Sequence, residues 1–262
     1  MNKENLDKYM NKENLDKYLF AYSNSFKFIN ENEIYLTKFA SYLQSDIDKN
    51  IFIENFISLG IGHKIVSNTI FQNVLNSKIK NYYIVDGSET LVNEYKSKFR
   101  EFNNIHIIHS YFEEFIPENN LKFDRIEMGF ILEHVDNPLF ILKKYKEYLS
   151  PNGIIHIAVP NARSLHRLIG YKAGLLDDIY KLSEYDLMLG HKRYYDIDTI
   201  KDQIINTGLK ILDIKGLMLK PITADQMNRI GFFENENIIK ALVEIGEHYP
   251  EIANCIYLKA SL

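Results

Sequence analysis

The feature of the sequence that most limits its fold is a repeated alternation between short apolar runs and longer amphipathic stretches. Apolar runs of strand length occupy residues 55–60, 82–86, 105–110, 123–130 and 153–160. Short apolar strands that alternate with helices are typical of a parallel sheet covered on both faces. We therefore expect an α/β fold with a doubly wound, mostly parallel sheet. Ligands of such sheets bind at the carboxyl ends of the strands.

The pattern changes after the fifth apolar run. Residues 162–195 are irregular, and we expect a helical insertion with loops there. Two further strands, near 209–219 and 254–260, flank a second insertion at 218–250. Because no linker rich in Pro, Ser or Gly interrupts the chain, residues 19–262 are expected to form a single domain with both insertions on the substrate side.

The N-terminal segment contains a perfect repeat. The sequence MNKENLDKY at residues 1–9 returns unchanged at 10–18. A single tandem copy does not make a solenoid, which needs several stacked units. We interpret residues 1–18 as a duplicated segment that is poorly ordered in part. The apolar residues between Leu19 and Leu43 predict one or two helices over the core.

Composition excludes several classes of protein. The hydrophobic content of 46% is sufficient for a continuous core, whereas the net charge of −4 gives no broad cationic field for a nucleic-acid backbone. No apolar run approaches the roughly 20 residues of a membrane span, and no basic-then-apolar secretory signal opens the chain. We therefore expect a soluble cytoplasmic protein without a nucleic-acid partner. Cys255, the single cysteine, is expected to be a buried structural thiol.

A pair of glycines, Gly60 and Gly62, follows the first apolar run. A dinucleotide fingerprint would need a third glycine at position 65, where this chain has Ile65, and no Gly-Lys-Ser/Thr follows for a phosphate loop. S-adenosylmethionine (SAM) is a ligand that needs close backbone approach without a pyrophosphate site, and its ribose needs an acidic acceptor. Asp86, at the end of the next strand, stands where that acceptor belongs. The alternative is that the glycines only form a tight turn.

Several motifs in this order make the chain resemble the class I SAM-dependent methyltransferases. They are SLGIGHK, IVDGS, IIHSYFEEF and ILEHVDNP, the last followed by LSPNG and VPN. The resemblance implies a seven-stranded sheet whose last strand is antiparallel. It also implies that Gly60 and Gly62 approach the methionine moiety, that Asp86 takes the ribose, and that residues 110–113 flank the adenine. The expected cofactor-binding residues are Ser58, Gly60, Ile61, Gly62, Asp86, Gly87, Tyr111, Phe112, Glu113, Gly129, Phe130 and Leu132.

The chain departs from that family at three positions. Ser58 stands where an acidic residue is usual, Lys64 where a third glycine is usual, and Tyr111 where many relatives have aspartate. A serine loses the charge that strengthens a hydrogen bond to the cofactor's ammonium group. An inactive or weakly active SAM-binding protein of the same fold is therefore the alternative to an active methyltransferase, and an NAD-dependent oxidoreductase is a more distant one.

Two histidines are candidates for catalysis. His134 follows the fourth strand, and His191 lies in the insertion that should wall the acceptor site. Methyl transfer requires an acceptor held in line with the departing sulfur at roughly 3 to 3.5 Å. Histidine suits proton removal from a hydroxyl near neutral pH. We expect His191 first and His134 second to deprotonate or orient the acceptor. No residue spacing matches a zinc or calcium site, so no metal is expected.

The insertion also bears on the acceptor. It resembles methyltransferases of bacterial surface-polysaccharide (capsule) and nucleotide-sugar pathways, which implies a small or carbohydrate-type acceptor: a sugar hydroxyl or amine, or a phosphoryl-type decoration. Four cations, Arg163, Arg167, Lys192 and Arg193, would favour an acceptor with phosphate or carboxylate if they gather at the site. The alternative is that each is a surface charge.

Overall fold

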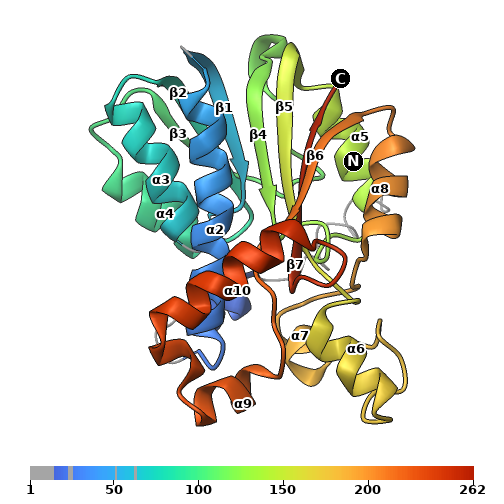
Figure 1. Cartoon of the computed structure of the whole chain (residues 1–262). Coiled ribbons are helices and arrows are strands. Elements are labelled where there is room, and N and C mark those ends of the chain that lie inside the picture. The colour runs from blue at the N-terminus through green and yellow to red at the C-terminus, as the bar shows by residue number, and fades with distance from the viewer. Residues whose placement is uncertain (1–14, 23–25, 51, 62–63) are drawn as a thin grey trace, which may run out of the picture.

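The computed structural model describes residues 15–22, 26–50, 52–61 and 64–262. Its centre is a seven-stranded sheet of order β3-β2-β1-β4-β5-β7-β6 (Figure 1). The strands are β1 (Ile53–Leu59), β2 (Ile79–Asp86), β3 (Ile105–His109), β4 (Phe123–Gly129), β5 (Leu149–Pro160), β6 (Lys210–Gly216) and β7 (Cys255–Ser261). Strands β1 to β5 pair in parallel, whereas β7 runs antiparallel to β5 and β6. The predicted sheet, with its antiparallel last strand, is confirmed.

Helices cover both faces of this sheet. α2, α3 and α4 pack on one face, and α5 and α8 pack on the other. The helices are η1 (Leu15–Tyr22), α2 (Ile29–Asp48), α3 (Lys64–Leu75), α4 (Glu89–Lys98), η2 (Glu118–Asn120), α5 (Pro138–Lys146), α6 (Leu165–Lys172), α7 (Glu184–Met188), α8 (Ile197–Ile205), α9 (Ala224–Arg229), η3 (Phe232–Glu234) and α10 (Glu236–His248). α6, α7 and α9 lie beyond the lower edge of the sheet in Figure 1, next to the carboxyl ends of its parallel strands.

Helical spacing of apolar residues explains how these helices attach. In α3, Val66, Ile70 and Val74 recur every four residues, and all three are buried against the sheet. The strands they cover are buried on both sides, as parallel strands in such folds are. In β1, every residue except Glu54 is buried. Because both faces of the strands are packed, the positions of their carboxyl ends are fixed.

α8, which begins directly after the first insertion, was not singled out in the sequence analysis. Asp196 caps it: its carboxylate accepts a hydrogen bond from the Thr199 backbone, and the Thr199 hydroxyl accepts one from the backbone of Asp196. Ile200 and Ile204 are fully buried in the core cluster that also contains the buried side chains of α5. The helix therefore ties the end of the insertion to the sheet.

The described N-terminal region, η1, lies near the carboxyl ends of the parallel strands. Residues 1–14 of the duplicated segment lie outside the described residues. η1 is fastened to the start of α4, because the Asp16 carboxylate accepts hydrogen bonds from the hydroxyls of Ser88 and Thr90, at 2.5 and 2.7 Å. The helices predicted over the core are present as η1 and α2.

Two further expectations can be compared with the structure. Cys255 is buried, as predicted, and burial raises the pKa of its thiol well above the usual value. Among the described helices, none combines the length and the apolar character that crossing a membrane requires.

Candidate active site

A cavity of about 800 Å³ lies at the carboxyl ends of the parallel strands. Its walls are the ends of β1, β2, β4 and β5, together with parts of η1, α2, the first insertion and residues 220–226. This is the edge at which doubly wound sheets bind their ligands. The volume lies within the range of about 300 to 1,000 Å³ that is usual for small-molecule sites.

The glycine turn after β1 forms one wall of this cavity. Gly60 has φ +85°, in the left-handed region that favours glycine, and its N–H donates to the carbonyl of Val85 at 2.7 Å. The next N–H, of Ile61, donates to Oδ2 of Asp86 at 2.7 Å, while Oδ1 of Asp86 accepts from the N–H of Ser88 at the same distance. The Asp86 carboxylate therefore holds the turn after β1 against the end of β2.

Burial shapes the charge of that carboxylate. Asp86 is 8% exposed, and burial raises its pKa although the N–H groups of Ile61 and Ser88 oppose the shift. Two backbone donors in a buried position stabilise the ionised form. The carboxylate keeps further lone pairs for a ligand in the cavity.

The predicted cofactor residues fall into three groups. Those lining the cavity are Ser58, Gly60, Ile61, Asp86, Gly87, Phe112, Gly129 and Phe130. Tyr111, Glu113 and Leu132 are described but do not line it, and Gly62 lies outside the described residues. Leu132 is fully buried in the core, where its carbonyl accepts a hydrogen bond from Arg193. Eight of the twelve predicted residues therefore line the cavity, and the role of all twelve in cofactor binding stays a prediction.

Glu127 is one of the wall residues that the sequence analysis did not single out. Glu127, in β4, lines the cavity and is only 4% exposed. Its Oε1 accepts a hydrogen bond from the Gly129 N–H at 2.6 Å, and burial raises the pKa of its carboxyl group to about 7. The available signal was a glutamate inside the otherwise apolar run IEMGF.

The two candidate histidines meet on the acceptor side of the cavity. The rings of His134 and His191 lie edge to face with their centroids 4.7 Å apart. Nδ1 of His191 lies 3.3 Å from Oδ1 of Asp186. Asp186 forms a capping box with Ser183 at the start of α7, and its Oδ1 also accepts a hydrogen bond from the Tyr194 hydroxyl at 3.0 Å. Ser183 and Tyr194 therefore hold the Asp186 carboxylate beside His191.

The pKa shifts in this group have opposite directions. Burial would raise the pKa of Asp186, but hydrogen bonds from His191 and Ser183 outweigh it and lower the pKa to about 2. Burial, followed by the nearby His191, lowers the pKa of His134 to about 3. Burial raises the pKa of Glu133 to about 7. At neutral pH, Asp186 is ionised and His134 is neutral.

Glu133, His134 and His191 also place one potential ligand atom each within 4.8 Å of one another. Two imidazoles and a carboxylate are a donor set that transition metals accept. The sequence-based expectation of a metal-free site remains a prediction, which chelation can test.

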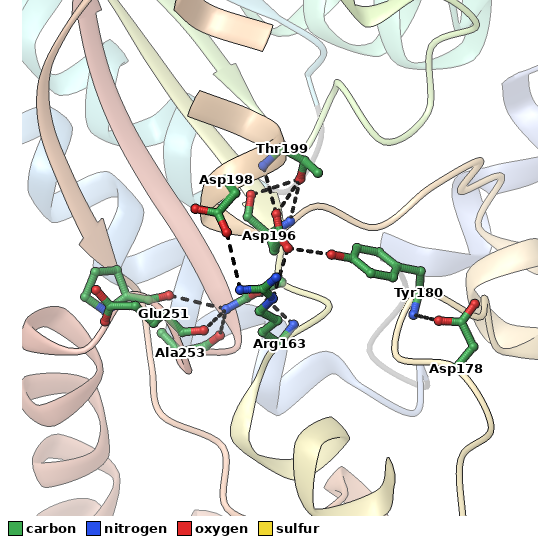
Figure 2. Close-up of polar contacts among 10 residues, drawn as sticks. Arg163, Asp178, Tyr180, Asp196, Asp198, Thr199, Glu251 and Ala253 are labelled. Carbon is green, nitrogen blue, oxygen red and sulfur yellow. Dashed lines mark hydrogen bonds and ion pairs between the residues drawn. The ribbon is translucent and has the colours of Figure 1, made fainter. Parts of the chain in front are cut away.

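The four cations of the first insertion do not gather in the cavity. Arg163 is drawn toward α8: its Nε lies 3.0 Å from Asp196 and its Nη1 3.3 Å from Asp198 (Figure 2). Lys192 pairs with Asp136, and Arg193 donates to the carbonyls of residues 132, 135 and 136. Of the four, only Arg167 lines the cavity. Three of these cations therefore hold the insertion in place instead of facing a ligand.

The family of methyltransferase domains matches residues 12–214 of the chain, which includes every strand up to β6. The match covers more than half of the sequence, and the strand order is that of class I SAM-dependent enzymes. The chain is a class I SAM-dependent methyltransferase. No curated protein sequence matches it.

Solved structures share the fold of this methyltransferase at low identity. The N-methyltransferase NodS from Bradyrhizobium japonicum WM9, in complex with S-adenosyl-L-homocysteine (SAH), is 10% identical with a TM-score of 0.55, over 95% of this chain and 98% of that one. A SAM-dependent methyltransferase from Clostridium acetobutylicum is 14% identical with a TM-score of 0.55, over 100% and 99%. The [4+2]-cyclase SpnF is 13% identical with a TM-score of 0.58, over 86% and 80%. At these identities the likeness shows the fold alone.

Family membership decides between some of the alternatives. SAM is the cofactor of this methyltransferase, so an NAD-dependent oxidoreductase is excluded. The acceptor is not identified by any of the comparisons, and none of them supports a role in capsule or nucleotide-sugar pathways.

Proposed function

We propose that this methyltransferase transfers a methyl group to a hydroxyl of a small, neutral, sugar-type acceptor. The observation that carries the proposal is the pairing of His191 with Asp186 in the wall of the cavity. A hydroxyl loses its proton when it is methylated, and a histidine held by a carboxylate is suited to take that proton. An amine with a free lone pair can react without such a base.

The cofactor half of the cavity supports an assignment of roles. When bound, SAM supplies a methyl group on a positively charged sulfur. We assign Gly60 and Ile61 to its methionine end, because the positive φ of Gly60 exposes the backbone there. Asp86 would accept from the ribose hydroxyls, and the ring of Phe112 would pack on the adenine. The fixed carboxylate and the open glycine turn are features that this ligand requires.

We further propose that residues 162–195 and 218–250 form the acceptor side of a single domain spanning 19–262. Both contribute to the cavity wall, the first through α6, α7 and the segment that follows, the second through residues 220–226. The acceptor would therefore lie between these two segments and the strand ends.

Unpartnered polar atoms support a hydroxyl-rich acceptor. The Glu133 carboxylate, Oγ of Ser164 and Nδ1 of His166 are buried, line the cavity and have no hydrogen-bond partner within the described part of the chain. Buried polar groups are nearly always hydrogen-bonded in folded proteins. A sugar-type ligand offers hydroxyls that both donate and accept, and so could satisfy all three.

The residues divide the chemical work between them. His191 accepts the acceptor proton, and the carboxylate of Asp186, which is ionised at neutral pH and lies 3.3 Å from Nδ1 of His191, stabilises the imidazolium that forms. His134 is a poor base because burial lowers the pKa of its imidazole to about 3, so we assign it a positioning role against His191. The cavity walls hold the acceptor in line, which is the larger part of catalysis in such a reaction.

One observation supports an anionic acceptor as a second candidate. Lys27 and Lys220 line the cavity but pair with Asp225 and Glu31. Arg167 instead donates to the backbone carbonyls of residues 179 and 181 and stacks on Tyr194, with 4.2 Å between its guanidinium carbon and the ring centroid. Its charge is thus available to a phosphate or carboxylate on the acceptor, such as a nucleotide sugar or a capsule precursor.

The test combines an acceptor panel with a histidine variant. Neutral sugars, sugar phosphates, nucleotide sugars and amines are assayed for methyl transfer from SAM. His191→Asn retains an amide N–H near the position of Nδ1, so it can still bind Asp186 but cannot take a proton. On the true acceptor, kcat should fall by about 10²- to 10⁴-fold with little change in SAH affinity.

His106→Asn is the matched control, because His106 stacks on Tyr83 outside the cavity wall. It should retain wild-type turnover. A His191→Asn enzyme that turns over at the wild-type rate would show that His191 is not the base. Cofactor binding without turnover over the whole panel would favour the inactive alternative.

A further inference from the structure

A buried carboxylate stands beside the glycine turn without a cation to balance it. Ser58 in β1 and Glu127 in β4 are register partners in the parallel ladder, so their side chains lie on the same face of the sheet. Both line the cavity, and they are 2% and 4% exposed. Ser58, where the family usually carries an acid, is thus next to an acid contributed by the neighbouring strand.

The conformation of Glu127 brings its charge to the edge of the sheet. Its side chain bends toward the carboxyl end of β4, where Oε1 accepts from the N–H of Gly129. A Cβ at position 129 would lie 2.7 Å from that oxygen and 2.4 Å from the ring of Phe39, so only glycine leaves space for both. The carboxylate is therefore held at the carboxyl end of β4, beside the turn that contains Gly60.

The polar side chains around Glu127 include a hydrogen-bonding partner, Ser58, but no free cation within the described residues. On the two strands beside β4, Ser58 bonds the Tyr82 hydroxyl at 3.0 Å, and the register partner His156 bonds the Tyr257 hydroxyl at 2.9 Å. Arg125, two residues before Glu127 in β4, forms an ion pair with Asp46 of α2.

No ion pair of Glu127 with a cation occurs within the described residues, and a buried carboxylate without one is costly to ionise. A carboxylate kept in that position is explained by a cationic ligand that enters the cavity.

We propose that Glu127 binds the α-ammonium group of the cofactor, supplying from β4 the negative charge that β1 lacks at position 58. The inference rests on the proposed placement of the methionine end at Gly60 and Ile61. SAM and SAH both carry this ammonium, whereas 5′-methylthioadenosine has the adenosine and sulfur but no amino-acid end. On this proposal, the acidic contact to the ammonium group comes from Glu127 in β4 in place of residue 58 in β1, and the site keeps its affinity for the cofactor.

The proposal predicts a pH dependence of binding. Burial raises the pKa of Glu127 to about 7 in the free protein, and a bound ammonium favours the ionised form. Below pH 7 the carboxyl proton must therefore leave on binding, and SAH affinity should fall by up to about tenfold per pH unit. Asp86, Glu133 and His134 also titrate in the cavity, so the comparison must be made with a Glu127 variant.

The experiment is calorimetric titration of wild type and Glu127→Gln with SAH and with 5′-methylthioadenosine at several pH values. The amide of Gln can still accept from Gly129, and thermal unfolding checks that the fold is retained. At pH 7.5, Glu127→Gln should bind SAH about 10- to 100-fold more weakly, with unchanged affinity for 5′-methylthioadenosine. Its SAH affinity should also lose the steep decline below pH 7. Glu94→Gln, on the exposed surface of α4, is the control.

The outcomes distinguish the role proposed for Glu127 from the proposed location of the cofactor. Equal loss of affinity for both ligands would overturn the proposal, because it would assign Glu127 a structural role. Unchanged SAH affinity in Glu127→Gln would overturn it as well. A folded wild type that binds neither ligand would instead refute the cofactor cavity itself.

Discussion

The clearest consequence of the site geometry concerns Asp86, whose carboxylate joins two turns. Oδ2 accepts from the Ile61 N–H and Oδ1 from the Ser88 N–H, both at 2.7 Å. Asparagine is nearly isosteric but has one acceptor oxygen, so in Asp86→Asn the amide NH₂ faces one of these N–H groups. From the sequence alone, Asp86→Ala is expected to weaken cofactor binding with little loss of fold. The structure predicts that replacing this carboxylate lowers both cofactor affinity and the free energy of unfolding.

The magnitude follows from the contacts. One buried backbone N–H is left without an acceptor, and the remaining bond loses its charge, which together cost about 1 to 3 kcal/mol of unfolding free energy. The same change loosens the Gly60 turn and removes the proposed ribose acceptor, so SAH affinity should fall about 10- to 100-fold. Urea denaturation measures the first quantity, and calorimetric titration with SAH the second.

A matched control exists at the opposite edge of the sheet. Oδ2 of Asp124 accepts from the N–H groups of both Glu54 and Asn55, at 2.9 and 3.1 Å, and Asp124 does not line the cavity. Asp124→Asn can keep an oxygen at that position, so it should lower stability only through the loss of charge and leave SAH affinity unchanged. If Asp86→Asn binds SAH as tightly as wild type does, the assignment of the ribose to Asp86 is refuted.

Two further predictions concern stability and metals. Asp46→Asn leaves buried Arg125 without its partner and should reduce the unfolding free energy by about 3 to 5 kcal/mol in urea. Burial opposes ionisation of Asp46, but His156, Lys259 and Arg125 hold its pKa well below the usual value, so this stabilisation is complete above pH of about 4 and is lost under acid. An unchanged difference between the two proteins at low pH would contradict that reasoning. Dialysis against a chelator should leave turnover intact; a loss that one divalent metal restores would instead assign a metal to Glu133, His134 and His191.

Much of the fold was predictable because it follows local patterns. The apolar spacing in residues 64–75 predicts a helix whose bounds agree with α3, and the apolar runs locate all seven strands. α8 was not singled out because it is a short amphipathic helix that directly follows an irregular insertion. The Asp196–Thr199 capping box was the local signal for its start.

The site was predictable only where it is local to strand ends. Gly60, directly after β1, and Asp86, the last residue of β2, were singled out from these places. Glu127 could not be assigned in this way, because its position beside Ser58 depends on the register between β1 and β4. The partners of Arg163 and Lys192 depend on how the insertion folds back, and no sequence spacing encodes that contact.

The most direct test of the central claim is a crystal structure of the full chain with SAH. The account predicts one SAH in the cavity at the carboxyl ends of β1, β2 and β4, with its ribose on Asp86 and its ammonium on Glu127. SAH bound elsewhere on the molecule, or its absence from crystals grown at saturating ligand, would contradict the account.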